Sequence, residues 1–149
     1  MNPLKGQALT STSRIIVAAL AAGAAAAGWY FFTPQDAVSP QIAGAAMVAV
    51  TVPDLTDTEK LGEAAFNAKC AACHGKDAAG QNGVAPPLVH AYYRAGHHGD
   101  MAFMLAAQNG VTAHHWRFGN MPPVTGLTDG DMKNIIAYVR AVQQANGIN

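Results

Sequence analysis

A hydrophobic run near the N-terminus is the strongest pattern in the chain. Residues 15–32 read IIVAALAAGAAAAGWYFF and contain no charged side chain. As a helix, this segment would be about 27 Å long at roughly 1.5 Å per residue, close to the roughly 30 Å hydrocarbon core of a bilayer. The run predicts a single transmembrane anchor. A cleaved signal sequence is the alternative, because residues 25–27 are alanines suited to cleavage, and a buried helix is a third interpretation.

Charges around this run predict its orientation. Lys5 and Arg14 precede it, and the first acidic residue is Asp36. Because basic flanks stay in the cytoplasm, residues 1–14 are predicted to be a cytoplasmic leader. The anchor and the signal sequence both export the rest of the chain. We therefore expect a single-pass protein of the bacterial cytoplasmic membrane, with its folded domain in the periplasm.

Residues 33–53 are predicted to be a linker. Pro34, Pro40 and Pro53 interrupt any long helix there. The apolar stretch 42–52 is too short to cross a bilayer. We interpret it as an extended tether that lies against the membrane or the folded domain. A contact surface for a membrane partner is the alternative.

Helical periodicity dominates residues 54–149. Thr56–Glu59 has the T-x-x-E form of a capping box and predicts the start of a first helix. Asp100 is expected to cap a second helix, which Gly110 would end. A last helix is expected to open at Thr128–Asp131. Its apolar face would comprise Met132, Ile135, Ile136, Val139 and Val142. Because no run of alternating strand residues occurs, the pattern predicts an all-α domain of three to four helices with long loops.

Composition and charge exclude several classes of function. The chain has 9 basic and 9 acidic side chains, so it has no polycationic surface for a nucleic acid. From residue 54 onward, seven basic side chains accompany eight acidic ones, which predicts weakly charged docking to partners. The sequence contains no recognisable Ser/His/Asp set, pair of catalytic carboxylates or phosphate-binding loop. It therefore predicts neither an enzyme nor a small-molecule substrate.

Both cysteines of the chain lie in one short motif. Cys70-Ala71-Ala72-Cys73-His74 has the C-x-x-C-H form of a c-type haem attachment site. The two thiols can form thioether bonds with one edge of a porphyrin, and the histidine can bind the iron. A dithiol redox pair lacks the surrounding βαβ pattern, a zinc site lacks a second pair of ligands, and a disulfide would close a very short loop. We therefore predict one covalently bound haem c.

Met121 is predicted to be the second axial ligand of the haem iron. It lies 47 residues after His74, in a segment whose glycine and prolines can brace a loop. Met101, Met104 and Met132 occur at helical spacing, where packing in the core is the ordinary explanation. Packing is also the alternative for Met121.

Residues 54–149 resemble a class I, mitochondrial-type cytochrome c of the small bacterial kind. The resemblance rests on Gly62, Phe66, Cys70–His74, Ala85–Leu88, Gly119–Pro122 and Tyr138. It implies a cytochrome c fold wrapped around one haem, in which Gly62 and Phe66 of the first helix cross Tyr138 of the last. It also implies that the Pro86 carbonyl accepts a hydrogen bond from His74 Nδ1 and leaves Nε2 for the iron. Pro87 is the other candidate for this role.

A haem with both axial positions filled by protein favours one-electron transfer, because no position is vacant for a substrate. The predicted function is therefore an electron carrier tethered to the outer face of the membrane. The resemblance implies respiratory or photosynthetic redox complexes as its donors and acceptors. An integral electron-transfer subunit of a larger membrane oxidoreductase is the alternative. A haem sensor or small enzyme is a further one, and it requires that Met121 does not bind the iron.

Paired histidines depart from the pattern of the common small cytochromes. His97–His98, His114–His115 and His90 lie in predicted loops. We interpret them as exposed or hydrogen-bonded loop side chains, with a second metal site for copper or zinc and a pH-sensitive docking surface as alternatives. Trp116–Arg117 leads into the loop of Met121, where it either holds a haem propionate or simply packs. A histidine of this group is the alternative iron ligand to Met121.

Overall fold

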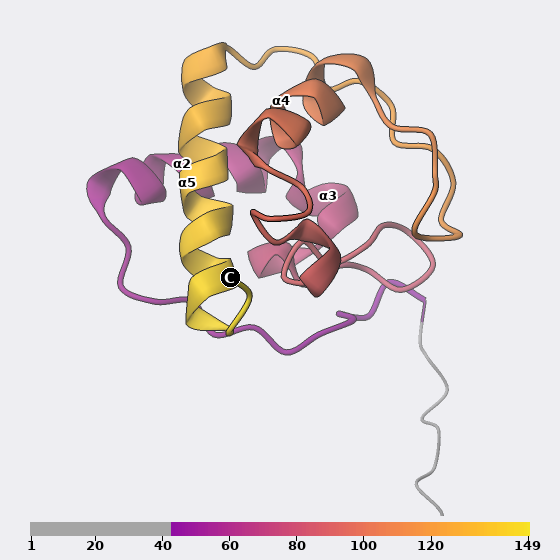
Figure 1. Cartoon of the computed structure of the whole chain (residues 1–149), viewed down its shortest axis with the longest axis horizontal. Helices are drawn as coiled ribbons and strands as arrows, with labels where there is room; N and C mark the ends of the chain where they lie inside the picture. Colours follow the sequence, from indigo (N-terminus) through magenta and orange to yellow (C-terminus); the bar gives the residue numbers. More distant parts are fainter. Residues whose placement is uncertain (1–42) are drawn as a thin grey trace, which may run out of the picture. The chain divides into compact units, whose positions relative to one another are not determined.

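Helices α2 (Asp57–Lys69) and α5 (Asp129–Ala145) cross and form the framework of the fold (Figure 1). The computed structural model describes residues 43–149, which lie within one compact unit. The predicted leader, the predicted transmembrane segment 15–32 and the first part of the predicted linker lie outside the described residues. Within residues 43–149, the structure has no helix that is both long enough and apolar enough to span a bilayer.

Both framework helices begin with a capping box. At the start of α2, the Glu59 amide donates to Thr56 Oγ1 at 3.4 Å, and the Thr56 amide donates to Glu59 Oε2 at 2.7 Å. At the start of α5, the Asp131 amide donates to Thr128 Oγ1 at 3.1 Å, and the Thr128 amide donates to Asp131 Oδ2 at 2.9 Å. These bonds satisfy amides that a helix N-terminus otherwise leaves unpaired. The two predicted helix starts are therefore confirmed.

The apolar face of α5 forms most of the core. All five side chains predicted for this face are buried: Met132, Ile135, Ile136, Val139 and Val142. Phe66 of α2 and Tyr138 of α5 are both fully buried where the helices cross. Gln143 of α5 is also buried, and its amide donates to the carbonyls of Leu88 and Tyr93 at 2.8 and 3.1 Å. This side chain ties the loop before α4 to the last helix.

Helix α4 (Asp100–Asn109) confirms one predicted boundary and corrects the other. It ends at Gly110, whose φ of +75° is a conformation that glycine adopts readily. Its N-cap is Gly99, and no side chain caps it. The expectation that Asp100 would be the cap was wrong, because its carboxylate accepts a hydrogen bond from Arg140 Nε of α5 at 2.9 Å. That ion pair joins the start of α4 to α5.

Loops and single helical turns make up the remainder of the described chain. The turns are α3 (Ala71–His74), η1 (Lys76–Ala78) and η2 (Ala91–Tyr93). The described residues contain no strand. Isolated β-bridges join Ala46 to Gln81, Gln81 to Ala85, and Val111 to Met121. The predicted all-α fold class is confirmed, whereas the sequence had not indicated the three short turns.

The described part of the predicted linker, residues 43–53, lies against the folded domain. Asn146 follows α5 and pairs with the backbone of Thr51: the Thr51 amide donates to Asn146 Oδ1 at 2.9 Å, and Asn146 Nδ2 donates to the Thr51 carbonyl at 2.7 Å. Three side chains of the same segment pack against the core: Val48, Val50 and Val52. The segment was expected to lie against the membrane or against the folded domain, and its described part lies against the domain.

Candidate functional site

A single helical turn brings both thiols and the adjacent imidazole to one place. Cys70 ends α2 and begins α3, and its carbonyl accepts hydrogen bonds from the amides of Cys73 at 3.1 Å and His74 at 2.8 Å. Both cysteines are free. Burial, and after it the nearby Cys73, raises the pKa of the Cys70 thiol to about 11. The Cys70 thiol is therefore protonated at neutral pH.

A backbone carbonyl fixes the orientation of the His74 ring. His74 Nδ1 lies 2.9 Å from the Pro86 carbonyl oxygen, and because a carbonyl only accepts, Nδ1 carries the proton. The predicted hydrogen bond is therefore present, and it is made by Pro86. Burial lowers the pKa of His74, and the bond to Pro86 opposes this effect in part. The ring is held neutral, with the lone pair of Nε2 available to a metal.

Backbone pairing holds the loop that carries Met121. Met121 pairs with Val111: the amide of each of these two residues donates to the carbonyl of the other at 2.9 Å. Gly110 allows this approach, because a Cβ atom there would lie 2.5 Å from the Met121 carbonyl oxygen. Further along, the Val124 amide donates to the Ala107 carbonyl of α4 at 2.8 Å. The loop is therefore fixed to the end of α4.

One cavity of about 540 Å³ unites the predicted site residues. Its lining includes all five of them: Cys70, Cys73, His74, Pro86 and Met121. Most of the remaining wall is apolar and includes Phe66, Leu88, Phe103, Val111, Met132 and Ile135. A cavity of this volume with apolar walls is typical of a site for a small molecule or cofactor.

The chemistry of the wall fits a covalently attached haem. Two thiols, an imidazole nitrogen and a thioether sulfur in the wall are the groups that would attach such a haem and bind its iron. Trp116 adds an independent sign, because its indole Nε1 is buried at the cavity and has no hydrogen-bond partner. Burial raises the pKa of Tyr93 and its neighbour Trp116 lowers it in smaller part, but the indole Nε1 makes no hydrogen bond with the Tyr93 hydroxyl. A haem propionate would supply the acceptor that the indole lacks.

Further residues line the cavity, some expected from the sequence and others not. Of the pair expected to hold a propionate, Trp116 lines the cavity, whereas Arg117 is exposed and does not line it. Tyr93 and Phe103 line the cavity although no motif marked them. The sequence shows that both side chains are aromatic, but their position at the cavity depends on how the loops fold around α5. His98 and His115 also line the cavity.

A comparison with protein-family models agrees with the geometry. The family model described as Cytochrome c matches residues 59–143, more than half of the chain. The matched segment contains the two cysteines, His74, Pro86 and Met121. The comparisons with curated proteins and with solved structures give no match.

Proposed function

The chain belongs to the cytochrome c family, so that it carries a covalently bound haem c and acts in haem-based electron transfer. From this premise, we propose that Cys70 and Cys73 hold the haem and that His74 and Met121 are its axial ligands. The family match and the helical architecture confirm the predicted fold and cofactor. The single observation that carries the ligand assignment is the cavity lined by all four of these side chains. The family's role as an electron carrier agrees with the prediction that the protein is not an enzyme.

Each site residue has a role that follows from its environment. The Pro86 carbonyl keeps the proton on His74 Nδ1, so that Nε2 presents its lone pair without rotation of the ring. The pairing with Val111 keeps Met121 at the cavity wall. When bound, haem supplies one-electron redox chemistry through its iron. A methionine ligand raises the reduction potential, and the apolar wall limits the access of water.

Carbon monoxide binding tests whether Met121 fills the second axial position. We expect the reduced holoprotein not to bind carbon monoxide, whereas Met121→Ala should bind it because the substitution opens that position. Met101→Ala is the matched control, since Met101 is exposed and does not line the cavity. Rapid binding by the unsubstituted protein would show that its iron has an open position, and would favour the sensor or enzyme alternative.

We further propose that the chain works at the outer face of a bacterial cytoplasmic membrane. The support is the basic leader followed by the hydrophobic run at residues 15–32. A membrane tether raises the effective concentration of the domain at membrane redox complexes without new contacts. As part of the same proposal, respiratory or photosynthetic complexes are its electron donors and acceptors.

Fractionation of cells tests this placement. We expect the haem-containing chain in the membrane fraction, resistant to high salt and released by detergent. A variant that lacks residues 15–32 should not be exported and should contain no haem. Recovery of the full chain as a salt-extractable protein would contradict the anchor. Purification in mild detergent separates a free carrier from the alternative, an integral subunit, because only the subunit would retain a stoichiometric partner.

A further inference from the structure

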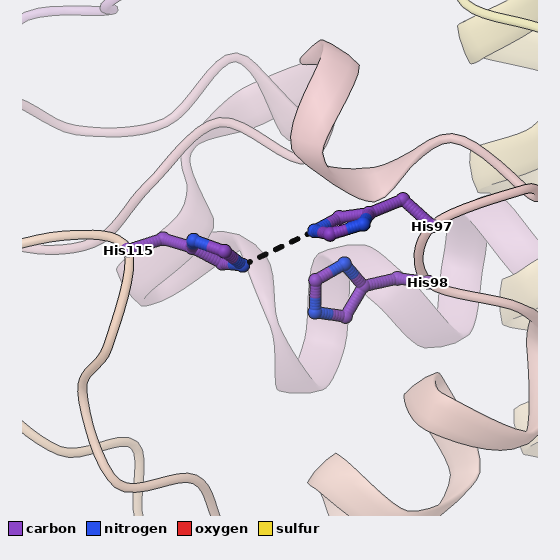
Figure 2. A group of neighbouring side chains, drawn as sticks. All are labelled: His97, His98 and His115. Atoms are coloured by element: carbon purple, nitrogen blue, oxygen red, sulfur yellow. Dashed lines mark hydrogen bonds between the residues drawn. The ribbon is translucent and has the colours of Figure 1, made fainter.

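Three imidazoles converge beside the haem cavity. His97 and His98 come from the loop before α4, and His115 comes from the loop between α4 and Met121 (Figure 2). Their ligand nitrogens all lie within 4.8 Å of one another. Figure 2 shows the His97 and His115 rings directed toward each other across the gap between the two loops, with His98 beside them. Histidines that are 18 residues apart in sequence are thus brought to one point.

The separation of two of these nitrogens matches that of metal ligands. His97 Nε2 and His115 Nε2 are 3.4 Å apart and share a hydrogen bond, which is longer than the roughly 2.7–3.2 Å that is usual for N–H donors. Two imidazole nitrogens that bind one zinc ion tetrahedrally at about 2.0–2.1 Å are roughly 3.3–3.4 Å apart. This pair therefore has the spacing of a two-ligand clamp.

A hydrogen bond to a backbone carbonyl orients the ring of His98, the third histidine. His98 Nδ1 donates to the Tyr92 carbonyl at 2.6 Å, which leaves the lone pair of Nε2 free. Arg140 of α5 supports the same loop, because its guanidinium donates to the carbonyls of His98 and Tyr93, each at 2.6 Å. The position of His98 is therefore fixed by the framework helix.

Local electrostatics favours the neutral form of the His115 imidazole. Desolvation, followed by the imidazoles of His114, His98, His97 and His90, lowers the pKa of His115. Among residues 43–149, no ion pair joins any of these histidines to a carboxylate. The neutral imidazole is the form that binds metals.

Ring contacts hold the three imidazoles together. Tyr92 stacks on His115 with ring centroids 4.6 Å apart and an interplanar angle of 21°. That contact accounts for the position of the His115 ring. The rings of His97 and His98 also contact each other and His115, with centroids 4.7 to 5.4 Å apart. These contacts hold the three ligand nitrogens close together.

We propose that His97, His98 and His115 bind one divalent transition-metal ion, zinc or copper. An all-imidazole set suits these ions, whereas calcium and magnesium prefer oxygen ligands. Three histidines leave a fourth position for water. Because His98 and His115 also line the haem cavity, the ion lies at the edge of that cavity. This site is separate from the haem ligands and goes beyond the proposed electron transfer.

Zinc titration of the oxidised holoprotein tests the site, because zinc is redox-inert and cannot react with the haem. Calorimetry should show one Zn²⁺ bound per chain. His97→Asn, His98→Asn and His115→Asn should each weaken the affinity at least tenfold, since asparagine has no atom at the position of Nε2. Asparagine at position 98 can still donate to the Tyr92 carbonyl, so that the loop keeps its tether.

A histidine outside the triad of His97, His98 and His115 serves as the matched control. His90 Nδ1 accepts a hydrogen bond from the Tyr92 amide at 3.2 Å, and an asparagine can replace this acceptor. His90→Asn should therefore change the zinc affinity by less than about threefold. The haem absorption spectrum and circular dichroism verify that each variant is folded.

X-ray absorption at the zinc edge supplies a second readout that does not depend on affinity. We expect the outer-shell scattering of three imidazoles in the zinc-loaded holoprotein and of two in each triad variant. No binding up to millimolar zinc would overturn the proposal. So would triad variants that bind like the unsubstituted protein, a control that loses as much affinity as they do, or an oxygen-only first shell.

Discussion

Gly62 of α2 lies directly against the backbone of Asn134 in α5. A methyl group on Gly62 would be 1.9 Å from the Asn134 carbonyl oxygen and 2.9 Å from Tyr138 Cβ. One turn along α2, the rings of Phe66 and Tyr138 lie with centroids 5.5 Å apart and planes tilted by 52°. The crossing that the family resemblance implied for these residues is confirmed. It allows α5 to present its apolar face to the haem cavity, which Met132 and Ile135 line.

We predict that Gly62→Ala destabilises the holoprotein by at least about 2 kcal/mol, because the added methyl group forces two packed helices apart. Denaturant unfolding followed by circular dichroism measures the change. Gly96→Ala is the matched control, since a Cβ atom there meets nothing within 4 Å and the backbone has no positive φ. That control should change the free energy of unfolding by less than about 0.5 kcal/mol. Equal stability of the two variants would contradict the close crossing.

The acid limb of stability is predicted to depend on Asp131. Its backbone and side-chain hydrogen bonds with Thr128 lower the pKa of the Asp131 carboxyl. The Asp131 carboxylate therefore binds a proton more readily in the unfolded chain than in the folded one. Its contribution to the free energy of unfolding is full above about pH 4 and is lost as the pH falls through the lowered pKa. We expect Asp131→Asn to lower stability at pH 7 and to reduce the further loss on acidification.

Asp129→Asn is the control for this pH profile. Asp129 lies in the same first turn of α5 and its replacement removes the same charge. Its carboxylate accepts a hydrogen bond from Gln108 Nε2 at 3.4 Å, which the asparagine Oδ1 can also accept. The variant therefore reports mainly the effect of the helix dipole. Urea unfolding between pH 2 and pH 7 gives both profiles. If the two variants had parallel profiles, the Thr128 hydrogen bonds would not be the cause.

The unpaired indole of Trp116 leads to a prediction about the haem potential. With an N–H donor on a propionate, less of the carboxylate's negative charge acts on the iron. Trp116→Phe removes the donor and should lower the midpoint potential, because negative charge favours Fe(III). Phe118→Leu is the control, since Phe118 stacks on Trp116 at 5.7 Å and has no donor. Potentiometric titration measures both, and an unchanged potential in Trp116→Phe would rule out this contact.

Docking to the redox partner is predicted to depend weakly on salt. Val84 and Leu105 line the cavity and are 43 % and 48 % exposed, so that the accessible edge of the cavity is partly apolar. The seven basic and eight acidic side chains from residue 54 onward nearly balance. Raising the salt concentration from about 20 to about 200 mM should change the rate of haem oxidation by isolated membranes less than about threefold. A tenfold fall would indicate electrostatic docking.

Local patterns predicted the parts of the fold that depend on neighbouring residues. The capping boxes at Thr56 and Thr128, the buried face of α5 and the glycine that ends α4 all follow from spacings of a few residues. The C-x-x-C-H motif marked attachment chemistry for the same reason. Asp100 shows the limit of such reasoning, because its side chain pairs with Arg140 across the fold instead of capping its own helix.

Contacts between distant loops could not be predicted. His97 and His115 each resemble an ordinary loop histidine, and only the fold of the two loops around α4 brings their Nε2 atoms to 3.4 Å. In the same way, the sequence placed Trp116 near Met121 but could not show that its indole would be buried without an acceptor. Both features depend on tertiary packing, which periodicity does not encode.

The most direct test of the central assignment is the absorption spectrum of the purified, oxidised holoprotein. Ligation by His74 and Met121 predicts a covalently bound, low-spin haem with a weak far-red band, and Met121→Ala should abolish that band. A low-spin spectrum without the band would exclude methionine as the ligand and favour a histidine. A chain that contained no covalently bound haem would contradict the whole account.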